Sequence, residues 1–490
     1  MKAKWAQDKL TELMGVEVEK SRGPLGITIA KKKIFSIMID FDLDRLQEWG
    51  HSLFDMQDYA DAAELYKKAA DMLGTSTRTA KALYMAARSY QLAGDASNAK
   101  SLFKRVIKDY PASVEVSEAA IQWGLTDLND NDPSEAISHF ELARSRKLNR
   151  QEDLISLFWL YESYKIKNTP NEMQKAQEEL INRFGLTYYG IIAYNDSKGV
   201  LPKFDPVKVK TGKTYFSDSE DAAFERAKAL LQRGLFDEAA SELTPLMNRP
   251  LNNAEAQILA NFFAQAMKYP KAFSLLTSII DGAPEKRNDF VVREIFPKEY
   301  WDLVSDDKLR SEIDPLLLLS VMKQESAFDQ RAVSHSGAQG LLQMIPPTAQ
   351  EVAQDLQTKL GDPKNDMFDP LINIRFCAWY LAKLIKKYDG SVPLALAAYN
   401  AGPKRISVFM NSKNGPLKDT WVDELPWAET SYYVKSILKN YLMYRVLYTG
   451  LTQLPSPPWS QGPVTAQAAP VQNSKTSVRA PKTTEQAPAH

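Results

Sequence analysis

Asp58-Tyr-Ala-Asp-Ala-Ala-Glu-Leu-Tyr66 recurs as Asp95-Ala-Ser-Asn-Ala-Lys-Ser-Leu-Phe103 and as Asp132-Pro-Ser-Glu-Ala-Ile-Ser-His-Phe140, each copy 37 residues after the one before. In every copy an alanine precedes an aromatic residue by four positions: Ala62 and Tyr66, Ala99 and Phe103, Ala136 and Phe140. Residues four apart share one helix face. A small residue lets a neighbouring helix approach, and the aromatic fills the space one turn later. Three matches at constant spacing predict stacked helix pairs, an α-solenoid.

A further copy, Leu235-Phe-Asp-Glu-Ala-Ala240, stands well downstream, so the solenoid is expected to run with irregular units from about residue 42 to 300. The period is near that of tetratricopeptide repeats, and the helix pairs are expected to resemble them. The repeat consists of packing residues, with no constellation of acids or nucleophiles. We therefore expect this part of the chain to act through shape and surface, and to be where protein partners would bind.

The composition excludes several classes of function. The 490 residues are 44% hydrophobic and 25% charged, typical of a soluble globular protein with more than one domain. The formal net charge is zero, which removes the basic footprint of a nucleic-acid binder. One cysteine, Cys377, and four scattered histidines favour neither an internal disulfide nor a metal cluster. No cofactor or metal is expected.

Changes in composition along the chain predict its domains. Residues 201–218 contain prolines, a glycine and no helical period. From Thr452 the chain becomes rich in Pro, Ala, Gln, Ser and Thr, with seven prolines between Pro455 and Pro488, so a disordered tail is expected. The predicted division is an N-terminal extension (1–41), a tetratricopeptide-like α-solenoid (42–200), a connector (201–218), a further helical unit (219–300), a catalytic domain (301–452) and the tail (453–490).

The N-terminus and the apolar runs of the chain are where a secretory signal or a membrane-spanning segment would appear. No run approaches the roughly 20 apolar residues of a membrane span, so none is expected. The first 30 residues are polar and charged, and no secretory signal can be read in them.

The segment that carries chemistry begins at Asp314-Pro315, a capping residue followed by a proline suited to the first helical position. The helix is apolar nearly all round and ends in Gln324-Glu325-Ser326. A carboxyl group at the end of a buried helix is partly desolvated, which raises its pKa as a general acid requires. The alternative is that Glu325 sits at a solvent-exposed helix end.

Two later stretches add polar groups. Ser334-His-Ser-Gly-Ala-Gln-Gly-Leu-Leu-Gln343 has two glycines three apart, suited to a tight loop with close backbone approach. A helix from Val392 ends in Tyr399-Asn400-Ala401-Gly402-Pro403, where Gly-Pro stops it. Local capping is the alternative role for Gln343 and Asn400, and core packing is the alternative for Tyr399.

Four ordered motifs resemble those of the soluble lytic transglycosylases, goose-lysozyme-like enzymes that cleave peptidoglycan. They are Glu325-Ser326, Gly340-Leu-Leu-Gln343, Ala398-Tyr-Asn-Ala-Gly402 and Pro426-Trp-Ala-Glu-Thr-Ser-Tyr-Tyr-Val434. The resemblance covers roughly residues 305 to 450 and implies a lysozyme-like, mainly helical catalytic domain. The family places an α-superhelical domain ahead of it, so the expected fold class is all-α.

The resemblance also implies roles for individual residues. Glu325 would be the sole catalytic acid and base, and the substrate-binding residues would be Ser326, Ser334, Gln343, Tyr399, Asn400, Glu429 and Tyr433, with the last two opposite Glu325. Two positions depart from the family pattern. Leu342 replaces the common Met, a volume-conserving change. Cys377 stands where Gly is usual, so the packing around this position is expected to differ from that of the family.

The implied reaction cleaves the bond between N-acetylmuramic acid and N-acetylglucosamine of glycan strands and leaves a 1,6-anhydro end. Such a substrate implies the periplasm. One alternative is a hydrolytic muramidase on the same fold, with Asp329 or Asp369 as the second acid. The other is a non-catalytic scaffold whose solenoid binds glycan or protein.

Overall fold

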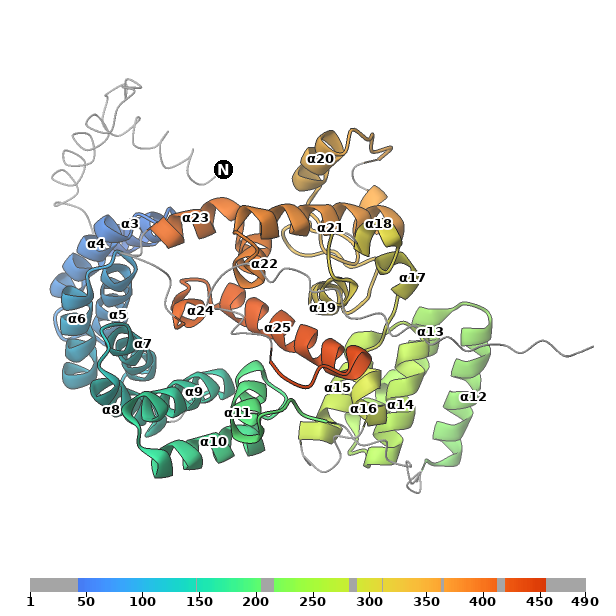
Figure 1. Cartoon of the computed structure of the whole chain (residues 1–490), viewed down its shortest axis with the longest axis horizontal. Helices are drawn as coiled ribbons and strands as arrows, with labels where there is room; N and C mark the ends of the chain where they lie inside the picture. The colour runs from blue at the N-terminus through green and yellow to red at the C-terminus, as the bar shows by residue number, and fades with distance from the viewer. Residues whose placement is uncertain are drawn as a thin grey trace, which may run out of the picture.

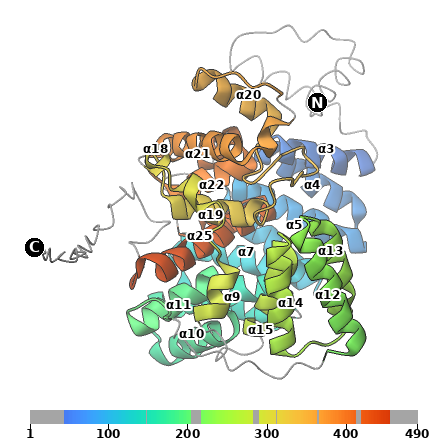
Figure 2. The ribbon, with the colours of Figure 1, turned by 90° about the vertical axis from the view of Figure 1, so that its right-hand side faces the viewer.

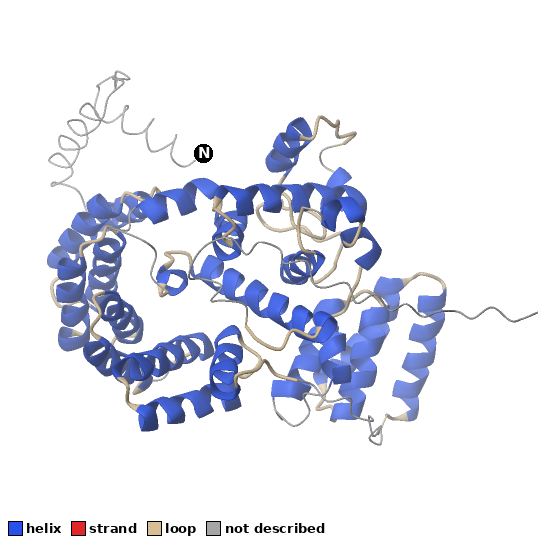
Figure 3. Cartoon of the chain, in the orientation of Figure 1, coloured by secondary structure: helices blue, strands red, loops and turns tan. Residues whose placement is uncertain are grey.

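The computed structural model describes residues 43–146, 148–203, 216–281, 289–310, 312–362, 365–411 and 419–454. Over these residues the fold is built from helices, and Figure 3 shows no strand among them. Within the described residues, β-type pairing is limited to two isolated antiparallel bridges, Val333 with Gln339 and Gln339 with Met344. The all-α fold class expected from the sequence is confirmed.

The first group of helices is the predicted solenoid, in which each helix packs on its neighbours in the chain. It curves along the left and lower edge of Figure 1. Its members are α3 (Leu43–Asp55), α4 (Tyr59–Leu73), α5 (Thr77–Leu92), α6 (Ala96–Asp109), α7 (Glu115–Asn129), α8 (Pro133–Arg144), α9 (Arg150–Lys167), α10 (Pro170–Phe184) and α11 (Tyr188–Lys198).

The packing of the repeat follows the small-then-large pattern. The three alanines and three aromatics of the repeat lie on α4, α6 and α8 and are all buried. The space for the aromatics comes from the preceding helices, since a Cβ atom on Gly50 would lie 2.9 Å from the ring of Tyr66, and one on Gly124 would lie 2.7 Å from the ring of Phe140. Ala87 occupies the same register between them and is buried. The repeat therefore includes a second small position, also spaced by 37 residues.

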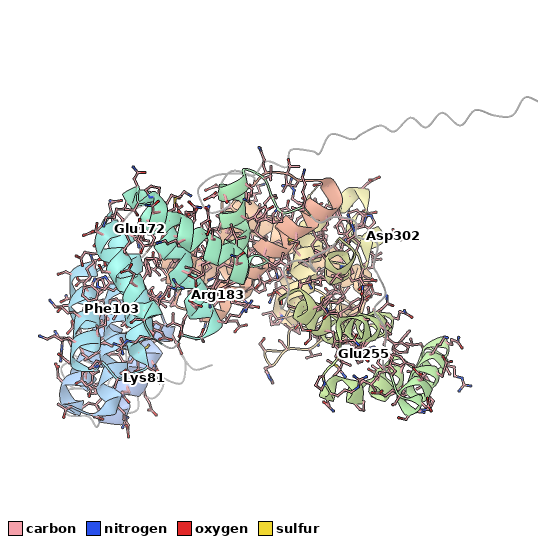
Figure 4. All side chains as sticks on the ribbon, turned by 90° about the horizontal axis from the view of Figure 1, so that it is seen from below. Lys81, Phe103, Glu172, Arg183, Glu255 and Asp302 are labelled. Atoms are coloured by element: carbon pink, nitrogen blue, oxygen red, sulfur yellow. The ribbon has the colours of Figure 1, made fainter. Side chains whose placement is uncertain are left out.

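A second helical unit follows at the other end of the molecule. It comprises α12 (Asp218–Gln232), α13 (Phe236–Leu243), the 3-10 helix η2 (Thr244–Asn248), α14 (Asn253–Gln265), α15 (Tyr269–Asp281) and α16 (Asp289–Ile295). Helices α12 to α15 stand beside one another in Figure 2. Figure 4 labels Phe103 in the solenoid and Glu255 in this unit, and the two lie at opposite ends.

The third group carries the predicted catalytic motifs. It comprises α17 (Trp301–Val304), α18 (Asp307–Arg310), α19 (Pro315–Glu325), α20 (Pro346–Asp355), the 3-10 helix η4 (Asp366–Phe368), α21 (Pro370–Lys387), α22 (Val392–Ala401), α23 (Pro403–Asn411), α24 (Trp421–Glu424) and α25 (Ala428–Thr449). The long α25 crosses the centre of Figure 1 and packs on α19 and α22.

Both ends of the solenoid contact this third group. At the first end, Nε2 of Gln57 donates to the carbonyl of Arg405, just inside α23, at 2.9 Å. At the other end, the amide of Leu201 donates to the carbonyl of Thr452, just after α25, at 2.7 Å. The solenoid therefore curves back to the third group, and α24 and the start of α25 lie on its inner side (Figure 1).

Some predictions concern residues outside the described ranges. The predicted N-terminal extension (1–41), most of the connector (201–218) and all but the first two residues of the predicted tail (453–490) lie there. The domain boundaries themselves stay predictions. Among the described helices, none combines the length and the hydropathy that crossing a bilayer requires.

Candidate active site

The site is organised around the end of α19. Asp314 caps the helix by accepting from the amide of Leu316 at 2.8 Å, and Pro315 is the first helical residue, so the predicted helix start is confirmed. The residues from Leu316 to Met322 are all buried. Glu325 closes the helix and is largely covered, not solvent-exposed. A buried apolar helix thus delivers one carboxyl group to the site.

The turn after Glu325 is held from behind by α15. Ala327 and Phe328 both adopt the left-handed conformation, with φ of 48° and 66°. Phe328 is fully buried, and its ring packs edge-on against Tyr269 and Phe273, with centroids 5.5 and 6.4 Å away. Such backbone conformations persist where the surroundings fix them. The second helical unit therefore supports the turn that follows the acid.

Glu325 faces α25. The hydroxyl of Tyr433 donates to Oε1 of Glu325 at 2.5 Å, and Tyr433 is itself buried. Burial raises the pKa of Glu325 to about 7, against the hydrogen bond from Tyr433, which lowers it, and with the nearby charge of Glu429, which raises it further. A carboxyl group with a pKa near neutrality can give up and take back a proton at neutral pH.

Tyr399 and Cys377 both contact the carbonyl of Leu342 in the loop before α20. The hydroxyl of Tyr399 donates to the carbonyl of Leu342 at 2.7 Å, so the loop holds the ring of this predicted substrate-binding residue. Burial first, and then the nearby charge of Glu325, raise the pKa of Tyr399 well above its ordinary value. Cys377 is buried and its Sγ lies 3.9 Å from the same carbonyl. Burial raises the pKa of the Cys377 thiol to about 12, so it stays protonated.

The loop before α20 is held by a buried amide that the sequence analysis did not single out. Oδ1 of Asn373, on α21, accepts from the amide of Leu342 at 2.9 Å. Its Nδ2 donates to the carbonyls of Gln339 at 3.0 Å and Met367 at 2.9 Å. Asn373 is completely buried. Because a buried amide must be satisfied, this set of bonds fixes the loop beside Glu325. The available signal was a lone amide within an apolar helix.

Other predicted contact residues are engaged in the same loop. Nε2 of Gln343 donates to the carbonyls of Ala332 at 3.0 Å and Gly340 at 2.8 Å. The hydroxyl of Ser326 donates to the carbonyl of Leu341 at 2.7 Å. These groups shape the loop, and a sugar contact by Gln343 would use its Oε1 atom.

The remaining predicted residues divide between two places. Oδ1 of Asn400, at the end of α22, accepts from the hydroxyl of Thr430 at 2.6 Å, which joins α22 to the first turn of α25. Glu429 is exposed on that turn. The hydrogen bonds of Ser334 stay within its own turn, with Ser336 and with the amide of Ala338. Asn400 and Glu429 therefore share the α25 side of the site, whereas Ser334 belongs to the loop between α19 and α20.

The two aspartates considered as second acids accept hydrogen bonds from backbone amides near them in the chain. Asp329 is exposed and accepts from the amide of Arg331 at 2.8 Å. Asp369 is the N-cap of α21 and accepts from the amides of Leu371 and Ile372. Within the described residues, no group of three or more His, Cys, Asp or Glu side chains is placed to hold a metal ion.

Comparison with known proteins addresses this same region. Residues 302–422 match the family model described as the transglycosylase SLT domain. Over these residues the chain is similar to the transglycosylase SLT family. A second model, tetratricopeptide repeat, matches residues 81–113, within the solenoid. The SLT domain and the repeat were both expected from the sequence.

Curated relatives match about a third of this chain. The soluble lytic murein transglycosylase of Escherichia coli is 30% identical over 155 residues, which is 31% of this chain and 24% of that protein. The membrane-bound lytic murein transglycosylase C of Cronobacter sakazakii is 29% identical over 167 residues, 30% of this chain and 46% of that protein. The chain thus matches about a quarter of the length of the first of these relatives.

Solved structures extend the likeness in fold to the solenoid. An inactive mutant of the lytic transglycosylase Slt from Pseudomonas aeruginosa superposes with a TM-score of 0.61 at 20% identity, over 82% of this chain and 67% of that one. The 70 kDa soluble lytic transglycosylase of Escherichia coli gives 0.52 at 17% identity, over 90% and 78%. A 70 kDa soluble lytic transglycosylase in complex with bulgecin A gives a TM-score of 0.52 at 18% identity, over 94% of this chain and 82% of that one. These matches support a superhelical region joined to a lysozyme-like domain.

The hydrogen bond from Tyr433 makes a testable contribution to the pKa of Glu325. Tyr433→Phe removes a donor that favours the carboxylate, so the pKa of Glu325 should rise. A general acid works only while protonated, so the alkaline limb of kcat/KM should move to higher pH. We also expect kcat to fall roughly tenfold, because the carboxyl group loses an orienting contact. The measurement is a pH–rate profile on a soluble glycan oligomer.

The matched control lies on the same two helices. The hydroxyl of Tyr441, on α25, donates to Oδ2 of Asp314 at the start of α19, at 2.6 Å. Tyr441→Phe removes a similar bond at the far end of α19 and should leave the alkaline limb in place. An unchanged limb in Tyr433→Phe would mean that Tyr433 does not act on Glu325.

Proposed function

We propose that the chain is a peptidoglycan lytic transglycosylase that uses Glu325 first as acid and then as base. The observation that carries the proposal is the state of Glu325, a covered carboxyl group at the end of an apolar helix with a pKa of about 7. Its place in an SLT domain gives that acid a substrate class, the glycan strands on which the named relatives act.

In the first half of the proposed reaction, Glu325 donates its proton to the glycosidic oxygen as the bond from C1 of N-acetylmuramic acid breaks. Tyr433 holds Oε1, so Oε2 is the oxygen left to carry the proton. The N-acetyl carbonyl of the substrate stabilises the positive charge that develops at C1. Burial of the site strengthens this interaction.

In the second half, the carboxylate of Glu325 takes the proton of the C6 hydroxyl of the same sugar. The C6 oxygen then bonds to C1 and closes a 1,6-anhydro ring. Water is not consumed, and Glu325 ends protonated, ready for the next turnover. One carboxyl group therefore suffices, in contrast to the pair that glycosidases ordinarily use.

The remaining predicted residues would bind the glycan. Glu429 and the free Nδ2 side of Asn400 lie on the α25 side of the site, and Gln343 and Ser334 lie on the loop side. Protein partners through the solenoid stay a prediction. The substrate class supports the periplasm as the place of action.

The product distinguishes this function from its alternatives. Purified peptidoglycan digested with the full chain should release fragments with anhydromuramic acid ends. Each such end should be about 18 mass units lighter than a reducing end, because no water molecule is added when the bond breaks. Reducing ends would instead support a hydrolytic muramidase. Binding of sacculi without release of any fragment would support the scaffold.

A further inference from the structure

A buried carboxylate joins the solenoid to the site. Asp423 lies on α24, and its side chain is 1% exposed. Its Oδ2 accepts from Nε1 of Trp159 at 2.8 Å and from the hydroxyl of Tyr189. Its Oδ1 accepts from Nζ of Lys435 and, at 3.5 Å, from the hydroxyl of Ser431. Two of these donors come from the solenoid and two from α25.

Burial makes this arrangement depend on both partners. A carboxylate and an ammonium group taken out of water must be paired and hydrogen-bonded, or the desolvation is uncompensated. Lys435 supplies the opposite charge, and its Nζ also lies 5.3 Å from the ring centre of Tyr189. Helices α9 and α11 of the solenoid supply the indole N–H and the phenol. The hydrogen bonds of the Asp423 carboxylate are therefore complete only when the solenoid is docked.

Solenoid side chains also donate hydrogen bonds to other groups of α24. Arg88 donates to the carbonyl of Glu424 at 3.1 Å, and Asn129 donates to its side-chain Oε1 at 2.7 Å. Nε2 of Gln122 donates to the carbonyl of Asp423 at 3.3 Å. These donors come from α5 and α7. Four solenoid helices thus fix one short helix of the SLT side.

Helix α25 connects Asp423 to Glu325, because it carries residues that bind each of them. Its two α25 donors, Ser431 and Lys435, flank Tyr433, which donates to Glu325. Residues on one helix move together, because each is held by the backbone hydrogen bonds of its neighbours. A shift of Lys435 would therefore shift the hydroxyl of Tyr433 against the carboxyl group.

We propose that Asp423 is a positioning residue through which the docked solenoid, by Trp159 and Tyr189, holds the first turns of α25 and so sets Tyr433 against Glu325. The inference rests on the proposed function for its kinetic consequence. It gives the solenoid a role in the chemistry that its repeat of packing residues did not indicate.

The test uses two tyrosines of the same helix pair. Tyr189→Phe removes the hydroxyl that reaches Asp423 and keeps the ring, which stacks on Phe158 with centroids 3.8 Å apart. Tyr161→Phe is the control, because its buried hydroxyl donates to Asp196 within the solenoid at 2.8 Å. Both variants lose a tyrosine–aspartate hydrogen bond, and only one of these bonds reaches the SLT side.

In the full-length protein, Tyr189→Phe should lower kcat on a soluble glycan oligomer by roughly tenfold with little change in KM, the cost of a misplaced catalytic group. Tyr161→Phe should leave both constants unchanged. Hydrogen exchange of the amides of residues 431–437 should be faster in Tyr189→Phe and unchanged in Tyr161→Phe.

The two readouts separate the possible failures. Exchange in α25 that is the same in both variants overturns the inference, whether or not the wild type cleaves glycan. Faster exchange in Tyr189→Phe with kinetic constants equal to those of the control also overturns it, because α25 would then be loosened without effect on the acid. A wild type that binds but never cleaves overturns the proposed function, and the exchange experiment still decides whether Asp423 holds α25.

Discussion

Glu325→Gln should lower the turnover of peptidoglycan by roughly 10²–10⁴, the range expected when a general acid is lost. Glutamine keeps the shape of the side chain and can still accept the hydrogen bond from Tyr433, but it has no proton to give to the glycosidic oxygen. Binding of glycan strands should be retained. The measurement pairs the rate of fragment release with a sedimentation assay on intact sacculi.

Two aspartates test whether a second acid is needed. Asp329→Asn and Asp369→Asn should keep most of the rate and the anhydro product, because both side chains are exposed and bind backbone amides. A large loss in either variant would favour the hydrolytic muramidase. A folded Glu325→Gln protein with near wild-type turnover would remove the acid assignment.

The same variant reports the raised pKa without any assay of activity. A buried carboxyl group with a folded pKa of about 7, above the ordinary 4.5, contributes stability that is fully present below pH 4.5 and is lost as the pH rises through 7. Glutamine does not titrate. The melting temperature of Glu325→Gln minus that of the wild type should therefore increase from pH 5 to pH 8. An equal difference at both pH values would mean that Glu325 is not desolvated.

Gly340→Ala should be the most damaging small substitution in the site loop. Gly340 has a φ of 77°, and a Cβ atom there would lie 2.0 Å from the carbonyl oxygen of Met367 and 2.5 Å from Nδ2 of Asn373. The left-handed conformation costs about 1–2 kcal/mol for alanine, and forcing the loop apart adds about 1–3 kcal/mol. The free energy of unfolding should fall by the sum of both, and most activity should be lost with the displaced loop.

Gly337 provides the control in the same loop. Its φ is 79°, but a Cβ atom there would meet nothing within 4 Å. Gly337→Ala should therefore show the conformational cost alone, about 1–2 kcal/mol, with activity retained. Thermal unfolding and rate measurements on both variants give the difference. Equal losses in the two would show that close packing against Met367 and Asn373 does not hold the loop.

The departure at Cys377 illustrates how the site accommodates a local change. The sequence raised a question about packing there, because the family usually has a glycine. The side chain is buried between the carbonyl of Leu342 and Oδ1 of Asn373, at 3.9 and 3.8 Å from Sγ. The thiol thus occupies space next to the same loop that Asn373 holds.

The sequence alone predicted the features that depend on neighbours along the chain. The spacing of 37 residues predicted the solenoid, because each repeat packs on the next and every unit contains the alanine and the aromatic residue that form this packing. Asp314 and Pro315 predicted the start of α19, and Gly402 with Pro403 predicted the end of α22. Caps and helix breaks are local backbone effects, so residue order is enough to place them. The end of that apolar helix offered Glu325 as a candidate acid, and the resemblance of the motifs to the lytic transglycosylases implied its role.

What only the tertiary structure decided is how these pieces meet. Tyr433 reaches Glu325 across 108 residues, and Tyr189 reaches Asp423 across 234. The amide of Gln343 turned out to bind its own loop, and Asn373 turned out to hold that loop from α21. A pattern in the sequence predicts which face of a helix is buried, but not which distant helix covers it. The pKa of the acid and the fixing of α25 depend on that covering, because both are set by burial and by hydrogen bonds between separate helices.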